Sequence, residues 1–348
     1  MAYTTIKKPS DYFNTKLYTG NGGTNAITGV GFQPDWTWIK SRTEGYGHSL
    51  FDAVRGVTKA IASEGTGAEY TFSTGLTAFG SDGFTLGSGT VVNNNSQNHA
   101  SWNWKANGAG SANTDGSISS TVSANTTSGF SIVSYTGTGS AGTVGHGLGS
   151  TPKMIIIKNI TQVTDWVVGH QEADTSNPWN KYLQLNDPTV PLDSPVFNDT
   201  APTNSVFSVG ADGKTSSGAG SHIAYCFADV QGYSKFGSYT ANGSTDGTFI
   251  YTGFKPAFFL AKRITNGTEP WVMFDNKRAN PFNGVTGILK PNLSEAETTQ
   301  GAGPSMDFLS NGIKFRNTDG TFNNSGIEFI YMAFAEQPLV GDNPATAR

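Results

Sequence analysis

The residues best suited to chemistry are two pairs of carboxylates that have similar neighbours. Asp52 with Glu69, and Asp275 with Glu297, recur at matching places in two parts of the chain. Two acids across a cleft could hydrolyse a glycosidic bond, one as general acid and the other as base or nucleophile. Because the pairs recur together with their surroundings, a role in the fold, such as capping a turn, is the more economical explanation. We therefore predict no catalytic residue.

Other residues with chemical potential are scattered. The five histidines show no spacing that would assemble a zinc site, and no Asp-Gly pair lies in a calcium-loop pattern. The single cysteine, Cys226, alternates with Tyr225 and Phe227 and is expected to be a buried apolar group. Residues 137–142 match Gly-x-Gly-x-x-Gly but lead into more glycines, which favours a hairpin over a nucleotide site. We predict no metal and no cofactor.

The composition indicates short strands joined by tight turns. The 348-residue chain contains 44 glycines, and 12% of its residues are aromatic. Only 14% are charged and the net charge is -4, so no footprint for nucleic acid or an anionic membrane is present. The sequence also has no apolar run long enough to span a bilayer and no signal-peptide pattern. We expect neither nucleic acid nor a membrane as a partner.

Three segments of the chain follow one register. Each opens with a Tyr-Thr turn, at Tyr18, Tyr135 and Tyr239. Each continues to a proline that is followed six residues later by a lysine, and these lysines are Lys40, Lys158 and Lys262. Apolar residues alternate between proline and lysine, as in a strand with one buried face. A repeat of about 100 residues is too long for a propeller blade and suits a small β-sandwich.

The predicted fold class is all-β, with three tandem, diverged β-sandwich units of jelly-roll or lectin-like type. The predicted division is an N-terminal arm at 1–11, unit 1 at 12–106, a Ser/Thr/Gly-rich linker at 107–127, unit 2 at 128–230, unit 3 at 231–338 and a C-terminal tail at 339–348. Residues 117–122 could instead add an edge strand. Units 2 and 3 have almost no linker between them and should pack rigidly.

Binding residues are sought where the units differ, because positions filled alike are explained by the shared fold. The tryptophans at shared positions are predicted to be core residues: Trp36, Trp38, Trp104, Trp166 and Trp271. Trp179 and Tyr46 have no counterpart and lie in predicted loops, where recognition concentrates. With Tyr182 beside Trp179, they are the predicted binding residues. Such aromatics could stack on a sugar, anchor a protein partner, or simply fill a local gap.

Several motifs resemble a family of virion proteins of marine tailed bacteriophages. They include Ile223-Ala-Tyr-Cys-Phe-Ala, Gly232-Tyr-Ser-Lys-Phe-Gly-Ser-Tyr and the stretches at 131–139 and 144–158. Members of that family are described as tail-fibre-like or as containing lectin-like (SPRY or concanavalin-like) sandwiches. The resemblance implies a component of a phage particle that is assembled in the host bacterial cytoplasm. Its implied partners are other virion proteins and copies of itself, and it brings no catalytic or ligand residues.

The expected function is that of a non-enzymatic structural protein of a virion. It would be a tail-fibre or receptor-binding component, or a capsid decoration, in a closed homo-oligomer. The first alternative is a carbohydrate-binding module or adhesin that engages a host surface glycan. A polysaccharide-degrading tailspike is the further alternative, although such enzymes usually show β-helical runs with short regular coils instead of units of about 100 residues.

Overall fold

A computed structural model describes residues 4–278, 283–299, 303, 305–340 and 344–345. Within these residues the regular structure consists of 28 strands, three one-turn α-helices and three 3₁₀ turns. The prediction of an all-β chain is therefore confirmed. Residues 1–3 of the predicted arm, and residues 341–343 and 346–348 of the predicted tail, lie outside the described residues.

The first part of the chain forms a four-stranded antiparallel sheet and a three-stranded one. The larger sheet has the order β1 (Phe13–Thr19), β9 (Asn98–Trp104), β3 (Trp36–Ser41), β4 (Ser49–Asp52). The smaller sheet has the order β2 (Asn25–Thr28), β8 (Gly83–Leu86), β7 (Leu76–Gly80). The remaining elements are η1 (Pro9–Asp11), the hairpin β5 (Lys59–Ala60) and β6 (Tyr70–Thr71), and α1 (Thr90–Asn93).

The same strand order recurs in unit 2. Its larger sheet contains β12 (Phe130–Thr136), β19 (Ser221–Phe227), β14 (Met154–Asn159) and β15 (Val167–His170). Two strand pairs accompany it, β13 (Gly142–Gly145) with β18 (Val206–Val209) and β16 (Lys181–Tyr182) with β17 (Leu192–Asp193). The short helical elements are η2 (Pro178–Asn180), η3 (Pro195–Phe197) and α2 (Gly213–Ser216).

Unit 3 repeats the order once more. Its larger sheet contains β20 (Ser234–Thr240), β28 (Glu328–Pro338), β22 (Phe254–Arg263) and β23 (Val272–Asp275). Its smaller sheet contains β21 (Phe249–Tyr251), β27 (Gly312–Phe315) and β26 (Met306–Leu309). The hairpin β24 (Gly287–Ile288) with β25 (Thr298–Thr299) and the helix α3 (Gly320–Asn323) complete it.

Residues 107–127, predicted as a linker, instead extend the sheet of unit 2. β10 (Ser111–Asn113) pairs with β11 (Ser120–Asn125), and β11 pairs with β12 over its whole length. Ile118 and Val122 are buried in the core of unit 2, so these two apolar side chains hold the segment down. The alternative of an added edge strand describes this segment better than a linker does.

Each of the three larger sheets is buried on both faces. In β3, Trp36 and Trp38 enter a core shared by all three units, whereas Ile39 enters a core belonging to unit 1 alone. The shared core is rich in large side chains, among them Trp36, Trp38, Trp102, Trp104, Trp166, Tyr225, Phe227, Phe258, Trp271 and Phe334. All five tryptophans predicted as core residues are buried, which confirms that prediction.

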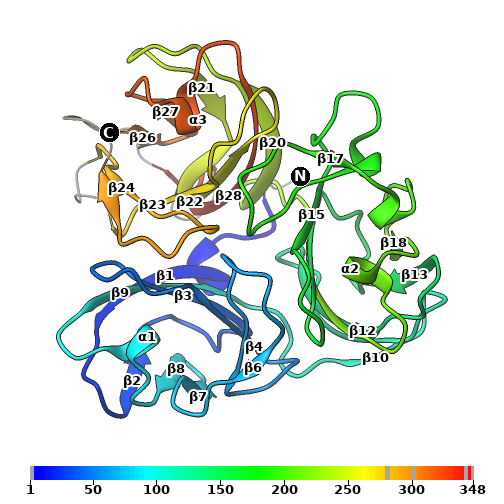
Figure 1. Ribbon diagram of the computed structural model, residues 1–348. Coiled ribbons are helices and arrows are strands. Elements are labelled where there is room, and N and C mark those ends of the chain that lie inside the picture. Colours follow the sequence, from blue (N-terminus) through cyan, green and yellow to red (C-terminus); the bar gives the residue numbers. More distant parts are fainter. Residues whose placement is uncertain (1–3, 279–282, 300–302, 304, 341–343, 346–348) are drawn as a thin grey trace.

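The shared core makes the three units depend on one another. Figure 1 shows them arranged around a common centre, unit 1 in blue and cyan, unit 2 in green and unit 3 in yellow to red. Hydrophobic burial favours this arrangement because each sheet would otherwise expose a large apolar face to water. The three larger sheets thus cover one another, and the number of sandwich units stays a prediction.

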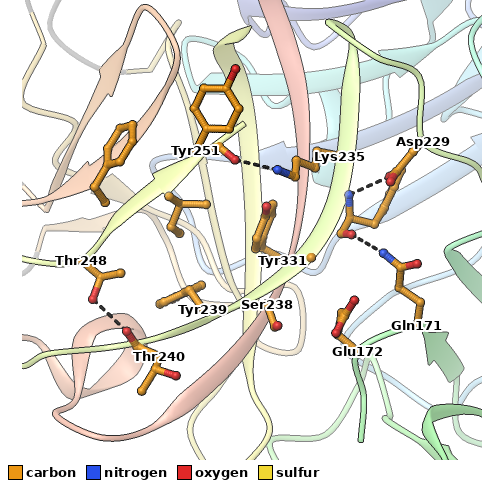
Figure 2. A pocket seen from close by; sticks show the side chains of 14 residues that line it. Gln171, Glu172, Asp229, Lys235, Ser238, Tyr239, Thr240, Thr248, Tyr251 and Tyr331 are labelled. Atoms are coloured by element: carbon orange, nitrogen blue, oxygen red, sulfur yellow. Dashed lines mark hydrogen bonds between the residues drawn. The ribbon is translucent and has the colours of Figure 1, made fainter. Parts of the chain in front are cut away.

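The N-terminal segment joins unit 1 to unit 3. The ring of Phe13 lies 4.9 Å from that of Trp104 in its own sheet, and 5.5 and 5.1 Å from those of Phe258 and Phe334 in unit 3. Part of the predicted arm is fixed here as well, since Ile6 is buried in the shared core. The contact between units 2 and 3 differs, because it is hollowed at the surface along β20 (Figure 2).

Candidate functional site

The first predicted pair of acids lies in a buried ion network. The side chain of Asp52 is fully buried and its Oδ2 accepts from Nε of Arg55 at 2.5 Å. Its Oδ1 accepts from the backbone N–H groups of Val54 and Arg55, as a turn cap does. Nη1 of Arg55 reaches Glu69 at 3.2 Å. Both acids therefore share one guanidinium, which fits the predicted role in the fold.

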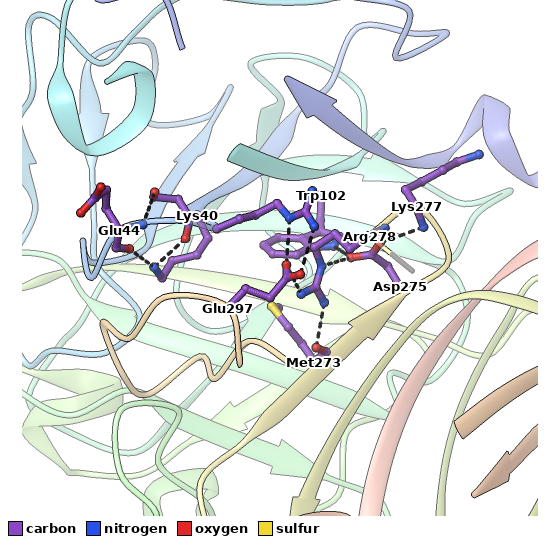
Figure 3. A network of polar contacts seen from close by, with 10 residues as sticks. Lys40, Glu44, Trp102, Met273, Asp275, Lys277, Arg278 and Glu297 are labelled. Carbon is purple, nitrogen blue, oxygen red and sulfur yellow. Dashed lines mark hydrogen bonds and ion pairs between the residues drawn. The ribbon is translucent and has the colours of Figure 1, made fainter. Parts of the chain in front are cut away.

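The second pair repeats this network at the contact between units 3 and 1 (Figure 3). Nε of Arg278 donates to Asp275 at 2.6 Å, and its Nη1 donates to Glu297 at 3.0 Å. Two residues of unit 1 complete it: Trp102 donates its indole N–H to Asp275 at 2.9 Å, and Arg42 binds Glu297 through two nitrogens. Burial opposes ionisation of Glu297, but the hydrogen bond from Arg42 and the charge of Arg278 outweigh it and lower the pKa.

Unit 2 carries a histidine at the position of these carboxylates. His170 pairs with Met154 across β15 and β14, as Asp52 pairs with Trp36 across β4 and β3. Burial lowers the pKa of His170 to about 4, so the ring is neutral near pH 7. Its Nδ1 accepts from the backbone N–H of Glu172 at 3.1 Å, which leaves the proton on Nε2 to donate to the carbonyl of Tyr331 at 3.2 Å.

These three residues form a cycle of contacts between units. Asp52 of unit 1 accepts from the hydroxyl of Tyr225 in unit 2 at 2.8 Å. His170 of unit 2 binds the backbone of unit 3, and Asp275 of unit 3 accepts from Trp102 of unit 1. We call these three contacts the seams. Each seam places the end of the last strand in one larger sheet against the closing strand of the next unit.

Two of the three repeated lysines also bind across contacts between units. Lys158 donates to the carbonyl of Thr66 in unit 1 at 3.1 Å, and Lys262 donates to that of Pro188 in unit 2 at 2.8 Å. Lys40 binds the carbonyl of Glu44 at 3.2 Å and lies beside the network of unit 3. Burial lowers the pKa of Lys158 to about 8 and that of Lys262 to about 7. Backbone carbonyls compensate in part for the loss of water around each ammonium.

The predicted binding residues lie mostly inside the protein. Trp179 is 7% exposed and packs against Phe197 with 5.3 Å between ring centroids, and Tyr182 is 5% exposed. The prediction that Trp179 is an exposed loop aromatic is therefore wrong, and both rings fill the core of unit 2. Tyr46 is half-buried, and its hydroxyl lies 3.4 Å from the side-chain nitrogen of Asn94. The structure does not bring Tyr46 together with the other two.

Cys226 and the histidines are placed as structural residues. Cys226 is fully buried in the core of unit 2, as expected, and burial raises the pKa of its thiol. His99 and His222 stack on Tyr18 and Tyr135 at 5.1 and 5.0 Å. In the described part of the chain, no group of three or more His, Cys, Asp or Glu side chains could hold a metal ion.

An open cleft of about 510 Å³ lies between units 2 and 3 (Figure 2). Its lining combines carboxylates, hydroxyls and aromatic rings: Gln171, Glu172, Asp229, Lys235, Phe236, Gly237, Ser238, Tyr239, Thr240, Thr248, Phe249, Ile250, Tyr251 and Tyr331. A second hollow of about 290 Å³ shares Glu172 and Ser238–Thr240 with it. This cleft is the candidate functional site, and sequence reasoning missed it.

One signal could have identified the cleft. In β21, Phe249 and Tyr251 alternate with buried Ile250 and are 43% and 50% exposed. The pairing registers place Ala26 and Thr28 of unit 1 at the positions of these two aromatics. The rule of searching where the units differ therefore points to β21, but only if strands are searched as well as loops.

Comparison with known proteins places all three units in one family. The chain belongs to the DUF7483 family. Its model, described as a domain of unknown function, matches residues 8–338. The DUF7483 match thus spans the three larger sheets, their shared core and the cleft. No curated protein matches the chain.

The repeated acids and arginines of this DUF7483 chain are engaged in its buried ion networks. Two of the repeated lysines bind across contacts between units, and the lining of the cleft includes Glu172 and Asp229. Among the described residues, no helix has the length and apolar character needed to cross a membrane.

Proposed function

We propose that this protein is a non-enzymatic structural protein of a bacteriophage virion, either a tail-fibre or receptor-binding component or a capsid decoration. The observation that carries the proposal is the use of the repeated charged residues in the seams. Asp52 and Asp275 are fully buried and each is neutralised by an arginine, so neither is available to a substrate. A chain whose repeated charged residues form buried ion pairs and contacts between units is suited to an architectural role.

The arrangement of the units adds to this proposal. Three sheets that share one core, with a seam at every contact, resist separation better than domains joined by linkers, because opening one unit exposes aromatic surface of the other two. A particle exposed to the environment needs such resistance. The virion assignment itself comes from the sequence motifs that resemble those of marine tailed-phage virion proteins. Its partners would be other virion proteins and copies of itself.

Mass spectrometry of density-gradient-purified particles tests the proposal. We expect peptides of this chain at a stoichiometry of a structural component, and enrichment in either the tail or the capsid fraction after the particles are dissociated. Absence of the chain from intact particles would overturn the virion assignment. Release of reducing ends from host polysaccharide by the purified protein would overturn the non-enzymatic part and favour a tailspike.

A further inference from the structure

The floor of the cleft between units 2 and 3 includes the hydroxyl of Tyr331. Tyr331 is 4% exposed, and its ring packs 5.6 Å from that of Phe259 in the core of unit 3. Its hydroxyl lines the cleft and forms no hydrogen bond with the described residues. A tyrosine with a buried ring and a hydroxyl open to a cleft presents its polar end to whatever occupies that cleft.

The residue opposite Tyr331 keeps that hydroxyl uncovered. Gly237 of β20 pairs with Tyr331 of β28, and a Cβ atom at Gly237 would lie 2.8 Å from the tyrosine oxygen. Any larger residue would therefore crowd the hydroxyl or cover it. Burial, with the charges of Asp229 and Glu172, raises the pKa of Tyr331. The phenol is therefore protonated and can donate a hydrogen bond.

One wall of the cleft is an exposed aromatic surface. Phe249 and Tyr251 lie on the same side of β21 because they are two residues apart in a strand. Lys235 fixes this wall, since its ammonium donates to the carbonyl of Tyr251 at 2.8 Å and lies 5.4 Å from the centre of the Tyr251 ring. Two large exposed rings beside a polar floor offer a surface for stacking.

The other wall supplies hydrogen-bond acceptors. The carboxylate of Glu172 has no bonding partner among the described residues, and Asp229 uses one oxygen to accept from the N–H of Phe236 at 3.0 Å. The second hollow adds the carboxylates of Asp174 from unit 2 and Glu328 from unit 3. Ionised carboxylates only accept hydrogen bonds, so the ligand must present donors. Their charge, against the single cation Lys235 in the lining, repels an anionic ligand.

We propose that this cleft binds an uncharged oligosaccharide. The apolar face of a sugar ring would stack on Tyr251 and Phe249, its hydroxyls would donate to Glu172 and Asp229, and a sugar oxygen would accept from Tyr331. The combined hollows of about 510 and 290 Å³ are large enough for more than one sugar ring. The proposal does not depend on the virion assignment, since it concerns the isolated protein.

Calorimetry with the full-length protein tests the ligand class. The probes are hexasaccharides of glucose, mannose, galactose and N-acetylglucosamine, compared with a hexamer of galacturonate. We expect at least one neutral hexasaccharide to bind and the acidic hexamer not to bind. Failure of every neutral probe overturns the proposal, and so does binding of the acidic hexamer alone. Binding of a Lys/Arg-rich peptide without any neutral sugar would also overturn it and indicate a protein partner.

Substitutions then test the site. Tyr251→Ala should weaken binding of the neutral sugar about 10-fold or more, as loss of a stacking ring does, and Tyr331→Phe about 2- to 10-fold through loss of one hydrogen bond. Tyr70→Ala is the matched control, because Tyr70 is a 43% exposed aromatic in unit 1, away from the cleft. Unchanged thermal midpoints would show that the variants fold. If all three variants bound the sugar as tightly as the wild type, the sugar would lie elsewhere and the assignment would be overturned.

Discussion

Replacing Arg278 by alanine should destabilise the protein by about 4 kcal/mol, within the range of about 3–5 kcal/mol for breaking a buried ion pair. The side chains of Arg278 and Asp275 are 1% and 0% exposed. The guanidinium also binds Glu297 at 3.0 Å and the carbonyl of Met273 at 2.9 Å. Its removal leaves a buried carboxylate whose remaining side-chain donor is the indole of Trp102. The expected loss is therefore that of an uncompensated charge.

Urea unfolding followed by tryptophan fluorescence measures this loss. With a slope of about 3 kcal/mol/M, a loss of about 4 kcal/mol lowers the unfolding midpoint by roughly 1.3 M. Arg316→Ala is the matched control, because Arg316 also forms an ion pair, with Asp307 at 2.7 Å, but its side chain is 38% exposed. Exposed pairs contribute about 1 kcal/mol or less, so this variant should stay near the wild type.

A second substitution separates charge from packing. If the cost of Arg278→Ala comes from the unpaired charge of Asp275, then Asp275→Asn in the same chain should restore part of the stability. The asparagine keeps an oxygen for Trp102 and removes the charge. The reasoning is refuted if Arg278→Ala costs no more than Arg316→Ala, or if the double variant is no more stable than Arg278→Ala alone.

Three further outcomes are expected. The pKa of His170 is lowered from 6.5 to about 4 in the folded protein, so the unfolded chain takes up the proton first as the pH falls. The free energy of unfolding should therefore decrease between about pH 6.5 and pH 4. His170→Gln should make that slope shallower by up to about 1.4 kcal/mol per pH unit, measured by urea unfolding at each pH. Cys226 should not react with a thiol reagent until the protein unfolds, because it is fully buried, and rapid labelling of the native protein would contradict this. Gly312→Ala should cost about 1–3 kcal/mol, since its Cβ would lie 2.0 Å from the carbonyl oxygen of Ile250, whereas Gly213→Ala, with open space around it, should be close to neutral in the same assay.

The fold class could be predicted because it depends on local pattern. Alternation around Trp36 and Trp38, and the lysine six residues after each proline, already indicate strands that occur three times. The shared core could not be predicted in the same way. A strand such as β3 is buried at every position, and a sequence does not say whether its second face meets a partner chain or another part of the same chain.

The candidate site was harder to predict for a related reason. Trp179 is unique to unit 2, and its neighbours predict an exposed loop. Uniqueness does not determine exposure, and the ring fills the space beside Phe197. The cleft combines Glu172 of unit 2 with Tyr251 and Tyr331 of unit 3, residues that are far apart in the sequence. Only the packing of one unit on the next brings them together. The seams share this property, since Trp102 and Asp275 are 173 residues apart in the sequence.

The shared core has a consequence for biosynthesis. Trp102 and Trp104 emerge from the ribosome long before Phe258 and Phe334, which cover them. At about 5–20 residues per second, the nascent chain carries an uncovered aromatic sheet for roughly 10–50 s before the last unit is complete. Chaperones would have to shield this face during that interval. A ribosome that stalls between units 2 and 3 would release an aggregation-prone fragment instead of a smaller stable domain.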